Sequence, residues 1–154
     1  PRGRALGVTE QSPKEDMLNY SQHYLEDRLA ILLGGRVAEN LVFEEASSGA
    51  ADDLKQATHL ARHMIQEWGM SNVLGPVTYR ETEQTFLGQE VSPPRVYSEH
   101  TAEIIDAEIT RLIKASEQRA LAVQQQYRDK LDKLAAALLE QETLGEEEIT
   151  AILA

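Results

Sequence analysis

The stretch that decides the fold, residues 21–41, reads SQHYLEDRLAILLGGRVAENL. Apolar residues recur in it at steps of mostly three, four or five, which places them on one face of an α-helix. They are Leu25, Leu29, Leu32, Val37 and Leu41. Gly34-Gly35 interrupts the pattern. Because each glycine costs a helix roughly 1 kcal/mol relative to alanine, the pair predicts a close approach by another element or a kink.

A second helix is predicted from about residue 50 to residue 68. It follows the break Ser47-Ser48-Gly49 and stops before Gly69, since glycine is favoured just past the end of a helix. Its predicted buried stripe advances by three or four residues and consists of Leu54, Ala57, Ala61, Met64 and Trp68.

A third stripe of mostly apolar residues runs over residues 98–138, and every step is three or four. One helix over this whole range would be unusually long, and Tyr127-Arg128-Asp129 offers a break with Asp129 as the cap of a new helix. We therefore expect two packed antiparallel helices here. Residues 143–146 (TLGE) have the spacing of a capping box and predict a short last helix.

The remaining segments predict little regular structure. Residues 70–96 contain three of the five prolines and no sustained period, so we expect a long loop with a short extended piece near Val77. Residues 5–9 (ALGVT) favour an edge strand, and residues 12–15 favour a turn. The predicted fold class is all-α with at most a short edge strand, in a single domain over residues 1–154.

Composition excludes several classes of function. Fifteen basic against twenty-six acidic residues give a net charge of -11 at pH 7, so the surface repels phosphate backbones and nucleic acid is not an expected partner. Cysteine is absent, so any metal must be held by histidine or carboxylate. No apolar run approaches the roughly 20 residues of a membrane helix, and no GxxxxGK[ST] loop is present. We expect these residues to be soluble and to bind no ATP themselves.

The sequence His59-Leu60-Ala61-Arg62-His63 has the i, i+4 spacing that places two imidazoles on one helix face, as in some zinc sites. In an HExxH motif the residue after the first histidine is the general-base glutamate, but here it is Leu60. Glu67 follows His63 by four residues and extends the stripe to three ligands. The pattern fits a structural or adventitious metal site, and the simpler interpretation is two surface histidines opposite the apolar stripe.

Asp52-Asp53 stands at the front of the second predicted helix. Carboxylates in a first turn are favoured by the helix dipole and by unpaired N–H groups, so capping is the simple explanation. A pair of glycosidase carboxylates fits poorly, since neighbouring helix residues point about 100° apart. From the residues alone, a metal ligand is not distinguished from a cap.

Several blocks of the sequence, in order and in register, resemble the protease domain of the FtsH family. They are residues 1–9 (PRGRALGVT), 24–30 (YLEDRLA), 33–39 (LGGRVAE), 48–54 (SGAADDL) and 68–71 (WGMS) with 74–76 (LGP). A looser similarity continues over the acidic tail and covers nearly the whole chain. Agreement of many blocks in register is far more specific than any single motif.

The resemblance implies a zinc endopeptidase domain in a homo-hexameric ring. In that family an upstream membrane-anchored AAA+ domain binds ATP and feeds unfolded or membrane proteins to the peptidase ring, at the cytoplasmic, stromal or matrix face of the membrane. Zinc is held there by two histidines of an HExxH helix and by a downstream aspartate. The alignment implies that Asp53 is this Zn²⁺ ligand, and Asp52 stands where the family usually has asparagine.

In the FtsH family the HExxH helix lies upstream of the block that begins here at Pro1. We therefore expect the chain to be the C-terminal part of the peptidase domain, truncated before Pro1, with no catalytic residue of its own and no activity alone. His59 and His63 are not catalytic positions in this resemblance. The alternative is a non-catalytic helical scaffold or oligomerisation domain from a family member that has lost HExxH, and the sequence upstream of Pro1 would separate the two.

Overall fold

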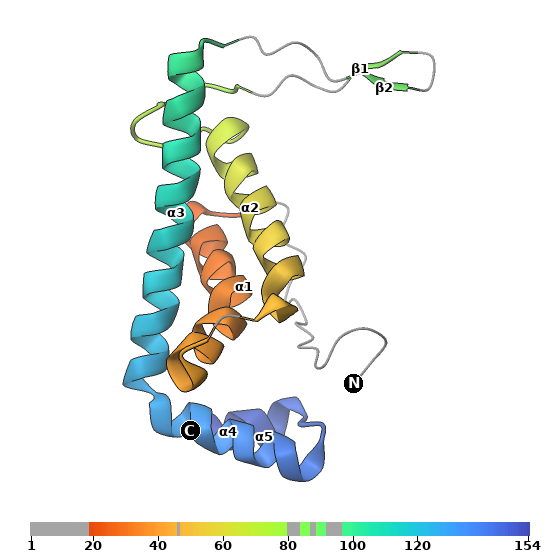
Figure 1. Cartoon of the computed structure of the whole chain (residues 1–154), viewed down its shortest axis with the longest axis vertical. Coiled ribbons are helices and arrows are strands. Elements are labelled where there is room, and N and C mark those ends of the chain that lie inside the picture. Colours follow the sequence, from red (N-terminus) through yellow and green to blue (C-terminus); the bar gives the residue numbers. More distant parts are fainter. Residues whose placement is uncertain (1–18, 46, 80–83, 87–88, 92–96) are drawn as a thin grey trace.

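A computed structural model describes residues 19–45, 47–79, 84–86, 89–91 and 97–154. Over these ranges the chain forms five α-helices, one short 3-10 helix and one two-stranded sheet. The helices dominate, so the predicted all-α class is confirmed. Figure 1 shows a long helix beside two shorter ones, with the small sheet near one end and the two last helices at the other. None of the described helices is both long and apolar enough to cross a membrane.

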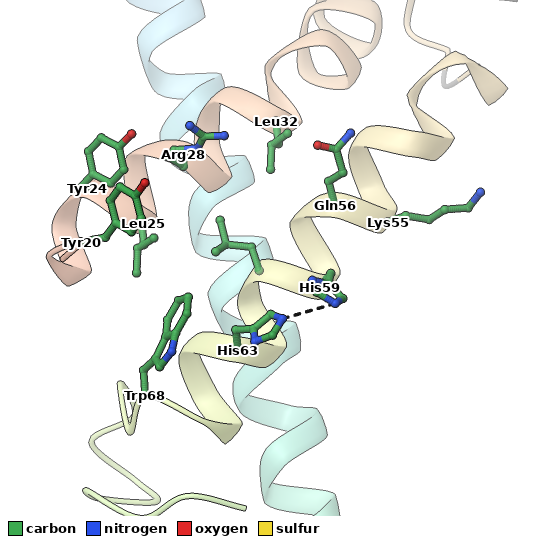
Figure 2. Close-up of a pocket in the computed structure, with 11 residues that line it drawn as sticks. Tyr20, Tyr24, Leu25, Arg28, Leu32, Lys55, Gln56, His59, His63 and Trp68 are labelled. Atoms are coloured by element: carbon green, nitrogen blue, oxygen red, sulfur yellow. Dashed lines mark hydrogen bonds between the residues drawn. The ribbon is translucent and has the colours of Figure 1, made fainter. Parts of the chain in front are cut away.

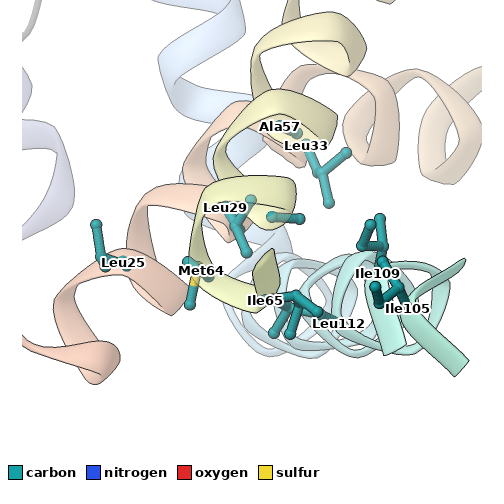
Figure 3. Packing of buried hydrophobic residues seen from close by; sticks show 10 residues of the cluster. Leu25, Leu29, Leu33, Ala57, Met64, Ile65, Ile105, Ile109 and Leu112 are labelled. Atoms are coloured by element: carbon teal, nitrogen blue, oxygen red, sulfur yellow. The ribbon is translucent and has the colours of Figure 1, made fainter. Parts of the chain in front are cut away.

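Three helices build the core: α1 (Gln22–Phe43), α2 (Ala51–Gln66) and α3 (Glu99–Gln126). Their facing side chains form one apolar cluster, seen at close range in Figure 3. Its buried members are Leu25, Leu29, Leu33, Ala57, Ala61, Met64, Ile65, Ile105, Ile109 and Leu112. Ala57 and Ala61 of α2 are fully buried and leave room for the larger side chains of α1 and α3.

Helix α1 begins as the sequence predicts. Ser21 is its N-cap, and the Ser21 hydroxyl accepts a hydrogen bond from the Tyr24 N–H at 3.3 Å. The predicted core position Leu32 is wrong in part: the fully buried leucine is its neighbour Leu33, and Leu32 is half-buried. The buried residues of α1 advance in steps of four. Because Leu32 and Leu33 are adjacent, the sequence pattern alone did not show which of them belongs to the buried face.

The two glycines inside α1 do not have the predicted role. The helix continues through both of them. A Cβ at Gly34 would meet the Gln124 side chain at an ordinary 3.7 Å, and a Cβ at Gly35 would meet nothing within 4 Å. Gln124 Nε2 donates to the Gly34 carbonyl at 2.8 Å, which ties α3 to α1. No approach seen among the described residues requires glycine here.

Helix α2 ends two residues earlier than predicted. Its last residue is Gln66, and Gly69 beyond it takes a left-handed φ of +62°. Trp68 therefore leaves the helical phase and is 47% exposed, so its predicted place in the buried stripe is wrong. Ile65, which the sequence analysis did not select, is fully buried instead.

The break predicted near residue 127 is confirmed. Helix α3 ends at Gln126, and α4 (Arg128–Gln141) begins after Tyr127, which caps it. The expected antiparallel packing is wrong, because α4 turns away from α3 and packs with α5 (Glu146–Leu153) (Figure 1). Asp129 is in the first turn of α4 and is not its cap.

The last helix is confirmed, but its cap is not Thr143. Helix α5 begins after Gly145, whose N–H donates to Glu148 Oε2 at 2.8 Å. A glutamate at the third helical position can reach back in this way whatever residue occupies the cap. The start of the helix is therefore two residues later than the capping-box spacing suggested.

The segment expected to be a long loop contains a small antiparallel hairpin. Strand β1 (Gln84–Phe86) pairs with β2 (Gln89–Val91), with Thr85 opposite Glu90. No strand forms at the described residues near Val77, where an extended piece was predicted: Val77 N–H donates to the carbonyl of Gly75 at 2.9 Å, and Tyr79 N–H donates to the carbonyl of Gln66 at 2.7 Å. The expected edge strand at 5–9 and the turn at 12–15 lie outside the described residues.

A polar network fastens the turn after α2 to α3. Glu108, only 5% exposed, accepts a hydrogen bond from the Ser71 hydroxyl at 2.7 Å and two from the Arg111 guanidinium at 2.7 and 3.1 Å. Ser71 Oγ also accepts from the N–H groups of Val73 and Leu74. The Arg111 and Ser71 hydrogen bonds hold the pKa of Glu108 below its ordinary value, against the opposing effect of burial.

We expect Glu108→Gln to lower the free energy of unfolding by about 1–3 kcal/mol at neutral pH, because the amide cannot pair with Arg111. A lowered folded-state pKa stabilises the protein above the ordinary value of 4.5, and this contribution is lost as the pH falls from 4.5 through the folded pKa. Urea unfolding at neutral and acid pH measures both effects. Glu103→Gln, an exposed change on the same helix, is the control. An unchanged acid slope in Glu108→Gln would contradict the role of this carboxylate.

Candidate functional site

Asp53 lies in the first turn of α2, and its residue is half-buried. Asp52 points into solvent with 85% of its side chain exposed, and it pairs with Lys55 Nζ at 3.3 Å. The two neighbouring carboxylates thus have different surroundings. Of the two, Asp53 is the one more closely packed against the rest of the fold.

The structure does not support simple capping by either aspartate. The cap position of α2 is Ala50, which is the last residue of the 3-10 turn η1 (Ser48–Ala50). Asp52 and Asp53 are second and third in the helix, where negative charge is still favoured by the helix dipole. The helix dipole therefore explains why acidic residues are favoured here. No capping hydrogen bond from a backbone N–H to Asp53 is needed for this explanation.

A carboxylate on α1 fixes the turn that leads into α2. The Glu39 carboxylate accepts hydrogen bonds from the Ser47 hydroxyl at 2.9 and 3.0 Å and from the Ser47 N–H at 3.2 Å. Ser47 Oγ in turn accepts from the Gly49 N–H at 3.1 Å. This chain of contacts ties the first turn of α2, with Asp53, to the C-terminal half of α1.

The sequence analysis missed Glu39 as a residue that positions this turn. Glu39 is eight residues from Ser47 in sequence, so no local capping rule pairs them. The sequence did contain a signal. Glu39 is the last residue of one block that resembles the FtsH family, and Ser47 directly precedes another. Nothing in those blocks indicates that the two touch.

One metal ligand does not make a complete site. Carboxylate oxygen is an ordinary zinc ligand, and Asp53 fits that donor type. However, no three His, Cys, Asp or Glu side chains are placed together to hold a metal within the part of the chain that the structure describes. Further ligands for a metal at Asp53 must come from elsewhere.

The two histidines of α2 are brought together, but not with Asp53. His59 Nε2 and His63 Nε2 are 3.3 Å apart (Figure 2). His63 Nδ1 is 2.7 Å from Glu67 Oε1. The Trp68 ring stacks on His63, with centroids 5.6 Å apart. Since a helix rises 1.5 Å per residue, Asp53 is about 9 Å from His59 along the axis. These are separate groups of side chains.

A cavity of about 580 Å³ lies between α1 and α2 beside these histidines. Its walls are mainly aromatic and aliphatic, and the two histidines, two cations and the Gln56 amide add polar groups (Figure 2). The aromatic, basic and histidine side chains in its lining include Tyr24, Arg28, Lys55, His59, His63 and Trp68.

Comparison with known proteins identifies the class to which this fold and sequence belong. The sequence model of peptidase family M41 matches residues 1–152. The chain belongs to this family of metallopeptidases.

Individual relatives are similar over nearly the whole chain. It is 50% identical over 153 residues to "ATP-dependent zinc metalloprotease FtsH" of Nitrosococcus oceani, and 51% identical over 154 residues to "ATP-dependent zinc metalloprotease FtsH 4" of Sphaerobacter thermophilus. A relative from Marinobacter nauticus with the first of these names is 48% identical. Each alignment covers 99% of this chain and only 23 or 24% of the relative, so the chain spans about a quarter of these proteins.

Proposed function

We propose that the chain is the C-terminal part of the peptidase domain of an ATP-dependent zinc metalloendopeptidase, with Asp53 as one zinc ligand. The names of the relatives support the activity. The observation that carries the site is the placement of Asp53, a half-buried carboxylate in the first turn of α2 just after a fixed Ser-Gly-Ala turn. Asp52 is solvent-exposed and engaged with Lys55, which favours Asp53 as the ligand.

Bound zinc would supply Lewis-acid chemistry for peptide-bond hydrolysis. The part of this chain is to offer one carboxylate oxygen and one negative charge from Asp53. Glu39 and Ser47 hold the turn that orients it, and the packed core of α1, α2 and α3 gives that turn a rigid base. The 154 residues contain no HExxH, so the histidine ligands and the general base belong to a segment outside them.

The same proposal assigns the partners. The peptidase domain assembles as a homo-hexamer, receives unfolded or membrane proteins from an ATP-binding ring in the same longer chain, and works at the cytoplasmic, stromal or matrix face of a membrane. The 154 residues alone are expected to be inactive. Family membership supports this assignment, and the placement of Asp53 links it to a residue of this chain.

The test is casein degradation by a longer chain that joins these residues to an HExxH segment and an ATPase domain. We expect ATP-dependent cleavage that a zinc chelator abolishes and added Zn²⁺ restores. The 154-residue chain should cleave no casein under the same conditions. Cleavage that survives metal removal would contradict a zinc enzyme. A natural upstream segment in which HExxH is altered would favour the non-catalytic scaffold.

A further inference from the structure

We propose that His59 and His63 form a second Zn²⁺ site in the wall of the cavity between α1 and α2, separate from the zinc assigned to Asp53. Glu67 is its positioning residue, and water or a small anion completes the coordination. Both histidines come from one helix face and line one cavity, as Figure 2 shows. The proposal depends on this geometry and not on the proposed function.

The distance between the two ring nitrogens is the first argument. Zinc binds imidazole nitrogen at 2.0–2.1 Å in tetrahedral geometry, so two such nitrogens on one ion lie about 3.3–3.4 Å apart. His59 Nε2 and His63 Nε2 are 3.3 Å apart. The ion can therefore be accommodated with little change in the distance between the two histidine nitrogens.

The metal-free pair is held together by a proton. Two neutral imidazoles can approach at this distance only if one Nε2 carries hydrogen and the other accepts it. When zinc binds both Nε2 atoms through their lone pairs, the ring that carried its hydrogen on Nε2 takes the tautomer with that hydrogen on Nδ1, by exchange with solvent. The contact that orients the rings in the free protein thus becomes the pair of ligands.

Glu67 stands where zinc-bound histidines usually have a carboxylate. Its Oε1 is 2.7 Å from His63 Nδ1, although the two atoms do not have the geometry of a hydrogen bond. Zinc at Nε2 leaves the ring hydrogen on Nδ1, and a small rotation of the carboxylate aligns the hydrogen bond. Such carboxylate–histidine–zinc arrangements fix the ring and raise ligand basicity. Trp68 stacked on His63 restricts the ring further.

Charges around the cavity limit the affinity. Lys55 is paired with Asp52, but Arg28 also lines the cavity from α1, and a cation there opposes Zn²⁺. The same guanidinium favours an anionic further ligand over water. With two protein ligands, the site should bind more weakly than a structural zinc site with four.

Calorimetric titration of the chain with Zn²⁺ alone tests the proposal. We expect one site, with the affinity falling at least about tenfold in His59→Asn and in His63→Asn, and about tenfold in Glu67→Gln. The double variant His23→Asn/His100→Asn removes the other two histidines and should bind zinc as the unchanged chain does. Asp53→Asn should also leave this affinity unchanged, which separates the site from zinc at the start of α2.

Two spectroscopic signals report the location and geometry. Trp68 is the only tryptophan and stacks on His63, so Cu²⁺ bound at the pair should quench its fluorescence. Co²⁺ at the same site should give the strong visible absorption of tetrahedral cobalt. Circular dichroism of each variant checks that the helices are retained. Unaltered zinc affinity in folded His59→Asn and His63→Asn, or equal loss in the His23→Asn/His100→Asn control, would overturn the proposal.

Discussion

In a longer chain that joins these residues to an HExxH segment, Asp53→Asn should lower the zinc affinity of the Asp53 site and casein cleavage by about a hundredfold. Asparagine keeps the shape of the side chain but removes the negative charge that favours the ion. The fold should survive, because the residue is only half-buried and no core contact depends on its charge. Zinc analysis and casein cleavage on the same preparation measure the effect.

Asp52→Asn is the matched control for this experiment. Its carboxylate is 85% exposed and pairs only with the exposed Lys55, so the change should alter stability by less than about 1 kcal/mol and leave activity intact. A purely electrostatic role at the helix end predicts a different result, in which both variants lose a little stability and neither loses activity. Full activity in Asp53→Asn would remove the assignment, and loss only in Asp52→Asn would transfer it to that residue.

Zinc content alone does not settle the matter if the His59–His63 pair also binds the ion. The measurement should therefore be repeated with Asp53→Asn in a His59→Asn/His63→Asn background. Proteolysis should depend on Asp53 in both backgrounds. Any zinc retained by Asp53→Asn and lost in the triple variant belongs to the second site.

The largest loss of stability is expected from Leu29→Ala, at about 2–5 kcal/mol. Leu29 is fully buried at the centre of the cluster shared by α1, α2 and α3. Truncation removes apolar contacts and leaves a cavity that these packed helices cannot close completely. For a chain of this length the melting temperature should fall by roughly 10 °C, which thermal unfolding followed by circular dichroism records.

Ile31→Ala on the same helix is the control, because Ile31 is 54% exposed. Its cost should remain within about 0.5 kcal/mol, the ordinary range for a surface change. If the two variants lost similar stability, the core would not lie on the face of α1 that the structure gives it.

Local sequence patterns predicted the helices well. Ser21 and the leucines after it indicated the start and face of α1, and the great length of the third stripe, with Asp129 as a possible cap, indicated the break near Tyr127. Such signals act within one or two helical turns, so the amino-acid order is sufficient to reveal them. Where two leucines adjoin, as at Leu32 and Leu33, the pattern could not choose the one that is fully buried in the core.

The sequence likewise predicted part of the candidate site, and the structure added the rest. Asp53 was selected by resemblance to a family, and the structure adds that its neighbour Asp52 is turned to solvent. The spacing of His59 and His63 was visible, but spacing alone did not give the 3.3 Å between their nitrogens. That distance depends on side-chain rotamers, which the cavity and Trp68 constrain.

The sequence by itself determined that this protein is helical, where most helices begin, and to which family it belongs. Only the tertiary structure decided that Trp68 is exposed, that Glu108 is buried with Ser71 and Arg111, and that α4 turns away from α3. Helix formation is encoded by neighbours in the chain. Burial, ion pairing and helix direction depend on contacts between residues distant in sequence, such as Ser71 and Glu108, and these contacts exist only once the chain has folded.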